Sequence, residues 1–330
     1  MIRTRIAGTG RGVPSKVLTN DDLSKMVETS DDWITARTGI KERRILEEGR
    51  STSDLAAEAA RNALAVAEVD PKDVDCIIVG TISPDMPMPA VAVTVQQKIG
   101  AGACAAFDLS AACAGFIYGM SVADAFIRMG QFKRVLVIGV EILSRIIDWT
   151  DRNTCVLFGD GAGAALLTAV DVKDGDEKGI LSTHIFADGA GVPWLHIPAG
   201  GSMMPASEKT VAEKQHLVKM QGKQIFTNAV KNISRASQIA LEANGKASTD
   251  VTWVVAHQAN MRILEGVSER VGIGLDRFYL NIHKYGNTSS ASIPIALDEA
   301  VREGKVKAGD LVLMAALGAG LSWGSALVRM

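Results

Sequence analysis

The chain has 330 residues, of which 47% are hydrophobic and 22% are charged. This composition excludes a disordered, collagenous or coiled-coil chain, and the length fits an enzyme with two lobes. The 35 basic and 37 acidic residues nearly cancel, so no overall positive field is available to hold a nucleic acid.

Targeting and redox signals are weak. The N-terminus lacks the pattern of a signal peptide, and no uncharged apolar run reaches the length of a membrane span. We therefore expect a soluble, cytoplasmic protein that does not act at a membrane. The four cysteines fit no zinc-binding spacing and the five histidines are scattered, so we expect reduced thiols and neither a disulfide framework nor a bound metal.

Strand and helix patterns alternate along the chain. Runs rich in Val, Ile and Leu predict strands at Ile2–Ala7, Val74–Val79, Val135–Val140, Ala164–Val170, Val251–Val255 and Leu311–Ala315. Because such unbroken apolar strands are typical of sheets covered on both faces, they favour an α/β fold. Helical periodicity predicts helices at Asp54–Glu68, Ala114–Met129, Gln224–Ala243 and Ile293–Arg302.

The two halves of the chain repeat each other. The segment DVDCIIVG matches DVTWVVAH, GAALLTAV matches GSALVRM, and FDLSAACAGF matches FYLNIHKYGN. The repeat predicts two similar halves, residues 1–172 and 173–330, with the boundary near Val172–Glu177. Pseudo-twofold symmetry of this kind places a site where the halves meet.

Cys113 is the first candidate for chemistry. It lies in DLSAACAGF, where a predicted strand ends near Leu109 and a helix full of small residues begins. The start of a helix favours a thiolate, which is the reactive form of cysteine, and the neighbouring alanines leave room for a substrate. A small buried core cysteine remains an alternative at this point. Three other cysteines, in or beside strands, keep that structural interpretation: Cys76, Cys104 and Cys155.

Two polar residues follow predicted strands or turns in the second half. His257 ends a strand and precedes a polar turn, which favours a place in a cleft, although a hydrogen-bonded structural histidine remains open. Asn287 lies in YGNTSSASIP, where the alternative is an asparagine that only stabilises a turn.

The glycine-rich GTGRGVP lacks the third glycine and the helix start of a dinucleotide site, so we do not expect an oxidoreductase. ALGAGLSWGSAL is interpreted as a tight connection between two buried strands.

Taken in order, DDWITARTGIKERR, DLSAACAGF, FGDGAGA, HQANMRI, YGNTSSASIP and GAGLSWGSAL closely resemble the β-ketoacyl-acyl carrier protein synthase III family of the thiolase superfamily. The resemblance runs from Ile2 to Met330. It implies a thiolase-like, five-layered αβαβα fold with two duplicated halves, in a homodimer. The implied activity is that of an acyltransferase of fatty acid biosynthesis, working through an acyl-cysteine intermediate.

The resemblance also implies roles for particular residues. A Cys–His–Asn triad falls on Cys113, His257 and Asn287, and the backbone N–H groups of Cys113 and Ala319 form the oxyanion hole. An acyl-CoA primer, most simply acetyl-CoA, acylates Cys113; malonyl-acyl carrier protein then loses CO₂ and attacks the acyl group, giving acetoacetyl-acyl carrier protein. Neither a metal nor a redox cofactor is implied.

Substrate contacts follow from the same resemblance. Trp33 and Arg37, four residues apart, predict a flat ring and a guanidinium facing one ligand, coenzyme A, with Arg152 as a second stacking position. The nearby Lys41 and Arg43 are interpreted as solvated surface. Residues expected to contact the acidic carrier protein are Arg262, Lys214, Lys219 and Lys223. Residues expected to line the acyl pocket are Met88, which would close it across the dimer, and Leu143, Leu157 and Phe158.

Two other functions remain open from the sequence. An enzyme of the same fold could serve a secondary pathway, such as alkylquinolone or polyketide priming, and sequence separates this poorly from fatty acid initiation. A non-catalytic partner subunit of a condensing complex belongs to a different class. Such partners have typically lost the nucleophile, so the presence of Cys113, His257 and Asn287 argues against it.

Overall fold

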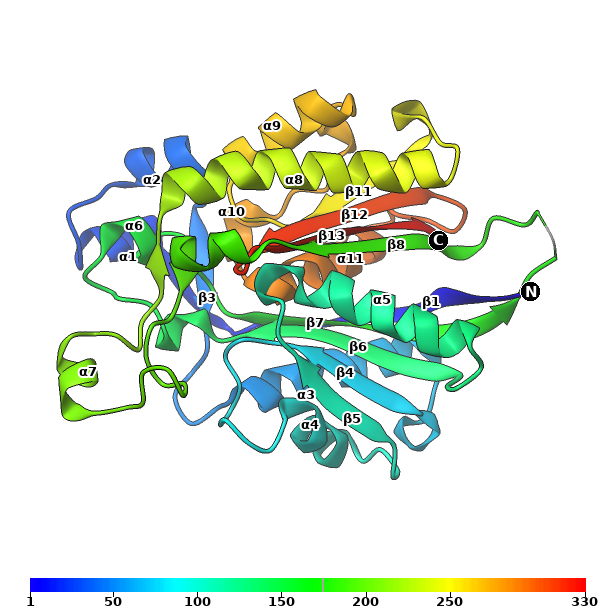
Figure 1. Cartoon of the computed structure of the whole chain (residues 1–330), viewed down its shortest axis with the longest axis horizontal. Helices are drawn as coiled ribbons and strands as arrows, with labels where there is room; N and C mark the ends of the chain where they lie inside the picture. Colours follow the sequence, from blue (N-terminus) through cyan, green and yellow to red (C-terminus); the bar gives the residue numbers. More distant parts are fainter. Residues whose placement is uncertain (174) are drawn as a thin grey trace.

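The computed structural model describes residues 1–173 and 175–330. Its long helices are α3 (Thr52–Ala67), α4 (Val91–Ile99), α5 (Gly115–Arg128), α8 (Gly222–Ala243), α9 (Met261–Val271) and α11 (Ser292–Arg302). Figure 1 shows five layers: α8 and α9 cover one sheet, α5 and α11 lie between that sheet and a second one, and α3 and α4 cover the second sheet. The thiolase-like αβαβα fold is therefore confirmed.

The two sheets have corresponding strand orders. The first, β1-β7-β6-β4-β5, consists of β1 (Ile2–Gly12), β4 (Cys76–Gly80), β5 (Ala105–Leu109), β6 (Arg134–Glu141) and β7 (Gly161–Asp171). The second, β8-β13-β12-β11, consists of β8 (Gly179–Ala187), β11 (Trp253–Ala256), β12 (Leu311–Gly318) and β13 (Ser322–Arg329). In both orders two antiparallel pairs are followed by a parallel pair.

The correspondence extends to the strand after β4, although one of the paired positions is shifted by a residue relative to the sequence repeat. The parallel pair of Ile78 and Phe107 in the first sheet has a counterpart in an isolated parallel bridge between Val254 and Phe278. These residues belong to segments that the sequence repeat aligned. The predicted boundary at Val172–Glu177 includes Asp174, which lies outside the described residues, so the division into 1–172 and 173–330 stays a prediction.

Glycines on β1 explain why this strand extends five residues beyond its predicted end. A Cβ atom at Gly8 or Gly10 would overlap the backbone of Ala63 in α3, and one at Gly12 would overlap the carbonyl of Leu55. Only glycine lets a helix backbone approach a strand this closely. The GTGRG motif therefore packs β1 against α3, which agrees with the sequence argument against a dinucleotide site.

Shorter elements complete the fold, and Figure 1 shows many of them at the end of the molecule on its left. They are β2 (Lys16–Thr19), α1 (Asn20–Ser24), α2 (Asp31–Thr38), β3 (Glu42–Ile45), α6 (Arg152–Cys155), β9 (Leu195–His196), α7 (Glu208–Ala212), β10 (Lys219–Met220) and α10 (Ile282–Tyr285). Among the described residues, no helix is both long and apolar enough to cross a membrane.

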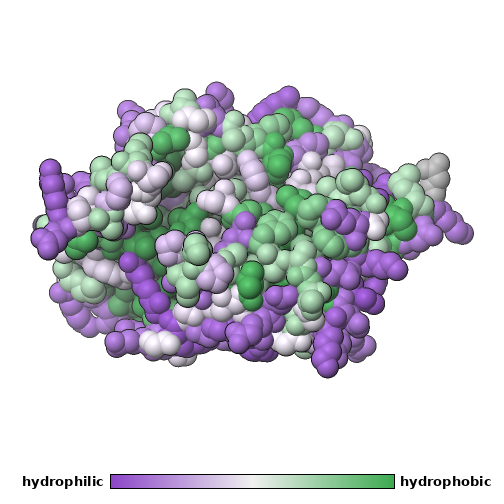
Figure 2. All heavy atoms as spheres, turned by 60° about the horizontal axis from the view of Figure 1, so that its bottom comes forward, coloured by the Kyte–Doolittle hydropathy of each residue, from purple (hydrophilic) through white to green (hydrophobic). Residues whose placement is uncertain are grey.

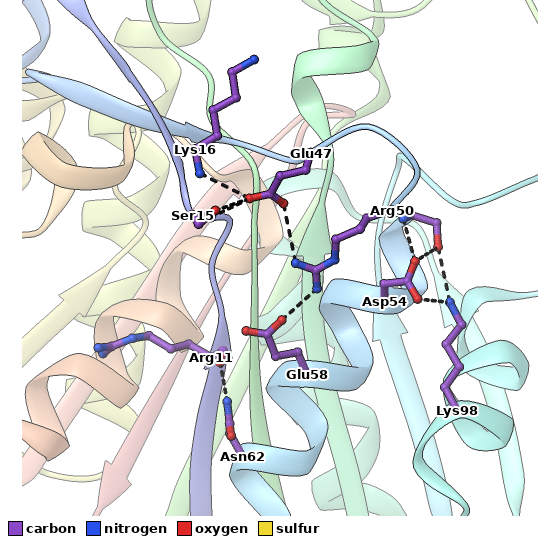
Figure 3. A network of polar contacts seen from close by, with 10 residues as sticks. Arg11, Ser15, Lys16, Glu47, Arg50, Asp54, Glu58, Asn62 and Lys98 are labelled. Carbon is purple, nitrogen blue, oxygen red and sulfur yellow. Dashed lines mark hydrogen bonds and ion pairs between the residues drawn. The ribbon is translucent and has the colours of Figure 1, made fainter.

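Exposed charges stabilise the start of α3. Figure 3 shows Arg50 between two carboxylates, at 2.8 Å from Glu58 and 3.6 Å from Glu47, and Asp54 paired with Lys98. Partly exposed pairs of this kind contribute roughly 0.2–1 kcal/mol each. Their role is to join α3 to the segment after β3 and to α4.

The interpretation of Arg43 as solvated surface is wrong. Its side chain is 0% exposed and donates hydrogen bonds to the Asn20 side chain at 2.8 Å and to the Val156 carbonyl at 2.7 Å. Burial lowers the pKa of its guanidinium to about 10. Arg43 therefore stabilises the interior through buried hydrogen bonds, whereas Lys41 is exposed as expected.

Candidate active site

Cys113 lies in a tight turn between β5 and α5. The turn is the 3₁₀ helix η2 (Ala112–Ala114), so the cysteine precedes α5. The prediction that Cys113 lies in the first turn of the long helix is therefore wrong. Ala112 has φ 45°, a left-handed conformation that costs a non-glycine residue roughly 1–2 kcal/mol. Such strain is typical of segments that hold a reactive group in one position.

A corresponding turn precedes α11 in the second half. It is η7 (Ser289–Ala291), and Ser289 has φ 50°. Asn287 is held just before this turn: its N–H donates to the Leu157 carbonyl at 2.8 Å, and its carbonyl accepts from Gly159 at 3.0 Å. Its side-chain Oδ1 accepts from the Ser289 N–H at 2.9 Å. This bond fixes the orientation of the amide and leaves Nδ2 as its donor group.

His257 directly follows β11. Its N–H donates to the Ala315 carbonyl on β12 at 2.9 Å, so the β11–β12 pairing fixes its backbone. The side chain is 1% exposed, and Nδ1 has no hydrogen-bond partner among the described residues. Burial lowers the pKa of this imidazole to about 4. At neutral pH His257 is therefore uncharged and able to accept a proton.

The segments that carry the three candidate residues meet at one place. A Cβ atom at Gly318, at the end of β12, would overlap the Cys113 nitrogen, and the His257 segment is bonded to the same strand. Cys113 and Ser289 line one cavity of about 230 Å³ together with Ala319. His257 and Asn287 are not among the residues that line this cavity, and in the described part of the chain no hydrogen bond joins the three catalytic candidates to one another.

The structure does not support a resting thiolate at Cys113. Burial raises the pKa of the thiol to about 12, and the nearby Glu141 adds to the effect. The favourable helix terminus expected from the sequence is separated from the sulfur by the η2 turn. At rest both groups are therefore neutral, a thiol at Cys113 and an imidazole at His257.

The two oxyanion-hole candidates both lie near the end of β12. The Cys113 N–H faces the end of β12, and Ala319 follows Gly318 in the tight β12–β13 connection predicted from the sequence. Among the described residues, the Ala319 N–H has no backbone acceptor. Two backbone donors near a nucleophile are the arrangement that stabilises a tetrahedral oxyanion.

Two of the four residues predicted to line the acyl pocket line the cavity that contains Cys113. Leu143 and Phe158 line the cavity with Cys113, and its other walls are also mainly apolar. Leu157 does not line this cavity. Met88 is 82% exposed on the single chain, so its predicted role across a dimer stays a prediction.

A second cavity shares two lining residues with this one. His196 and Val218 line both the inner cavity and a second one of about 360 Å³, whose wall is more polar. Nearby, the guanidiniums of Arg37 and Arg152 lie 4.4 Å and 4.7 Å from the centre of the Trp33 ring. The structure therefore brings these three residues together. For Trp33 and Arg37, their four-residue spacing in the sequence had predicted this.

The four residues expected to contact the carrier protein have different surroundings. Arg262 is exposed and donates to the Ala36 carbonyl in α2 at 3.0 Å, next to Arg37. Lys214 pairs with Asp148 at 3.0 Å. Lys219 is half-buried in β10 and Lys223 is exposed in the first turn of α8. Their contact with a carrier protein stays a prediction.

Sequence reasoning missed two polar residues near Cys113. Ser289 lines the cavity with Cys113, and Glu141, at the end of β6, is 0% exposed and accepts from Ser289 Oγ at 3.2 Å. The charged Glu141 within an otherwise apolar strand was the available signal. Among the described residues, no group of three or more His, Cys, Asp or Glu side chains is placed to hold a metal ion.

Comparisons with known proteins find relatives along the whole chain. Family models described as 3-oxoacyl-[acyl-carrier-protein (ACP)] synthase III and its C-terminal part match residues 107–195 and 241–330. The chain is 51% identical over 328 residues to the β-ketoacyl-[acyl-carrier-protein] synthase III of Caldanaerobacter subterraneus subsp. tengcongensis, covering 99% of this chain and 98% of the relative. It is 49% identical to that of Natranaerobius thermophilus, covering 100% of each. The crystal structure of 3-oxoacyl-[acyl-carrier-protein] synthase III from Aquifex aeolicus VF5 superposes with a TM-score of 0.90 at 46% identity, covering 99% of this chain and 100% of that one.

Proposed function

Because this chain belongs to the β-ketoacyl-acyl carrier protein synthase III family of acyltransferases, we propose that it initiates fatty acid synthesis by condensing acetyl-CoA with malonyl-acyl carrier protein. The observation that carries this proposal is the Cys113 thiol in an apolar cavity that also contains Ala319. A cavity of about 230 Å³ suits a short acyl group, and its apolar walls exclude the water that would hydrolyse an acyl-enzyme.

The first half-reaction transfers the acyl group to the enzyme. The sulfur of Cys113 attacks the thioester carbonyl while His257 accepts the thiol proton, since the pKa of its imidazole is low enough to keep it neutral. The N–H groups of Cys113 and Ala319 stabilise the oxyanion. The carbon–sulfur bond to coenzyme A then breaks, and the proton on His257 passes to the departing thiolate.

The second half-reaction forms the new carbon–carbon bond. Loss of CO₂ from the malonyl group leaves an enolate, whose oxygen needs hydrogen-bond donors. Asn287 Nδ2 and the Nε2–H tautomer of His257 supply them, and neither brings a fixed charge that would favour retention of the carboxylate. The enolate carbon attacks the acyl group on Cys113, and the carbon–sulfur bond breaks to release acetoacetyl-acyl carrier protein. The Cys113 thiolate that leaves takes up a proton from solvent, which restores the resting thiol. No step in this sequence requires a metal or a redox cofactor.

Coenzyme A is proposed to bind where Trp33 lies beside Arg37 and Arg152. The indole offers a stacking surface for adenine, and the guanidiniums offer charge-assisted hydrogen bonds to phosphate. The acidic carrier protein is proposed to bind to Arg262, Lys214, Lys219 and Lys223.

Trp33→Ala is expected to raise the KM for acetyl-CoA about tenfold, because one stacking contact contributes roughly 1–3 kcal/mol. The turnover number should change by less than about twofold, since the ring lies outside the inner cavity. Steady-state kinetics with varied acetyl-CoA measure both constants. Trp194→Ala, at a tryptophan outside this cluster, is the matched control; an unchanged KM for the Trp33 variant would contradict the assignment.

A homodimer is proposed as the working assembly. Strand β5 forms an open edge of the first sheet, and Met86 and Met88, in the loop between β4 and α4, are 48% and 82% exposed. Figure 2, which turns the lower side of Figure 1 toward the reader, shows apolar patches among the charged ones on that side. Pairing at an open edge and covering apolar side chains both favour association.

The proposed function is tested by supplying acetyl-CoA and malonyl-acyl carrier protein together. We expect coenzyme A, CO₂ and acetoacetyl-acyl carrier protein in equal amounts, measured by thiol release and mass spectrometry. Aromatic and long-chain acyl-CoA primers, tested in parallel, separate fatty acid initiation from secondary-pathway priming. Turnover with those primers but not with acetyl-CoA would replace the proposal by the secondary-pathway function, and absence of any turnover would refute condensation.

A further inference from the structure

A fully buried carboxyl lies behind the nucleophile. Glu141 is 0% exposed at the end of β6 and accepts hydrogen bonds from four donors. Ser83 Oγ donates to it at 2.6 Å, the Ile82 N–H at 3.1 Å, Thr81 Oγ1 at 3.3 Å and Ser289 Oγ at 3.2 Å. All four neighbours are neutral. A buried carboxylate without a cation costs several kcal/mol, so its position beside a reactive thiol calls for a functional explanation.

Ser289 connects this carboxyl to the nucleophile. Its side chain lines the same cavity as Cys113, and hydrogen bonding from its hydroxyl acts to lower the pKa of the Cys113 thiol, against the larger effect of burial. The same hydroxyl donates to Glu141. A hydroxyl carries one hydrogen, so it donates to one of these neighbours at a time. The charge on Glu141 therefore decides whether Ser289 donates to the carboxylate or to the sulfur.

We propose that Glu141 and Ser289 form a hydrogen-bond relay that controls the reactivity of Cys113. When Glu141 is ionised, the Ser289 hydroxyl donates to it and offers only a lone pair to the sulfur, which favours the thiol. When Glu141 carries a proton, it donates to Ser289, and Ser289 donates to the sulfur, which favours the thiolate. Glu141 is thus a positioning residue that acts through Ser289.

Two further observations support the relay. Ser289 has φ 50°, and its N–H is bonded to Asn287 Oδ1, so its backbone is held in place and the relay needs only the hydroxyl hydrogen to turn. Burial raises the pKa of Glu141 to about 7, so the carboxyl changes charge in the range in which an enzyme works. The groups facing it are the hydroxyls and amide named above and, beyond Ser289, the Cys113 thiol.

The relay is tested without any thioester substrate. The alkylation rate of Cys113 by iodoacetamide, read from the mass of the Cys113 peptide, reports its thiolate fraction between pH 6 and pH 9. Glutamine at position 141 can accept from Ser83 and donate to Ser289, which imitates protonated Glu141. Glu141→Gln should therefore react at about the native rate at pH 6 and about tenfold faster at pH 8.5, because the native carboxyl loses its proton between these values.

Combining the Glu141 and Ser289 substitutions distinguishes a relay through Ser289 from direct repulsion between the Glu141 carboxylate and the Cys113 thiolate. In a Ser289→Ala background, the gain from Glu141→Gln at pH 8.5 should fall below about threefold, as expected for two residues that act through each other. Glu299→Gln is the matched control, because Glu299 is also a buried carboxyl but bonds to Asn281 and Lys284. It should leave the alkylation profile unchanged.

Each outcome decides the proposal. A gain that persists at full size in Ser289→Ala, or no gain from Glu141→Gln at any pH, would overturn the relay. If Glu141→Gln does not fold, Ser289→Ala alone suffices: the native profile should show an inflection near neutral pH that this variant loses, and a native profile without an inflection contradicts the relay. The inference rests on the proposed role of Cys113, but alkylation requires no condensation, so the two proposals can fail separately.

Discussion

Cys113→Ala is expected to lower the rate of acetoacetyl-acyl carrier protein formation at least about 10⁴-fold, because removing the nucleophile of a covalent mechanism leaves only binding and polarisation. The side chain is small and its loss leaves little empty space, so the fold should persist. Thiol release from acetyl-CoA and product formation should disappear together. Both are followed in the assay that tests the proposed function.

Cys155→Ala is the matched control for this variant. Cys155 is also fully buried, but it lies outside the cavity that contains Cys113, among apolar side chains of the short elements. Burial raises the pKa of its thiol to about 11, which keeps it protonated. Its replacement should leave condensation within about twofold of the native rate, apart from effects of stability. If Cys155→Ala lost condensation activity and Cys113→Ala kept it, the assignment of Cys113 as the nucleophile would be contradicted.

Asn287→Ala is expected to separate the two half-reactions. Removing one donor from the enolate should slow malonyl decarboxylation about 10²–10³-fold, the range measured for loss of one oxyanion donor. Acylation of Cys113 by acetyl-CoA should stay within about fivefold, since it uses the backbone donors and His257. The first rate is read from CO₂ release and the second from the burst of free coenzyme A.

The control for Asn287 must also be a buried asparagine. Asn281 is 2% exposed and its amide donates to Glu299 at 2.9 Å, away from the cavity lining. Asn281→Ala should lower stability and leave the ratio of the two half-reaction rates unchanged. Equal loss of both half-reactions in Asn287→Ala would show that Asn287 acts on the nucleophile or on the fold, and not on the enolate.

Much of the architecture could be predicted from the sequence because the strongest signals are local. The predicted strands became β1, β4, β6, β7, β11 and β12, and the predicted helices became α3, α5, α8 and α11. Their apolar runs lie in sheets covered on both faces, where unbroken hydrophobicity is required. The repeat also predicted similar halves, and the matching strand orders follow from it.

Features that depend on the folded environment could not be predicted. The sequence suggested a helix start at Cys113, but the structure has a 3₁₀ turn, because Ala112 adopts a left-handed conformation that no propensity favours. Arg43 is charged and lies in a basic run, so only the three-dimensional arrangement shows that its donors meet buried carbonyls. Glu141 and Ser289 are 148 residues apart, and their hydrogen bond arises where the halves meet.

The assignment of the nucleophile is tested most directly by mixing the native chain with acetyl-CoA alone and measuring its intact mass. We expect a single acetyl group per chain, released by hydroxylamine as a thioester and located on the peptide that contains Cys113. An acetyl group on the peptides of Cys76, Cys104 or Cys155, or no adduct in a preparation that completes condensation, would contradict an acyl-Cys113 intermediate.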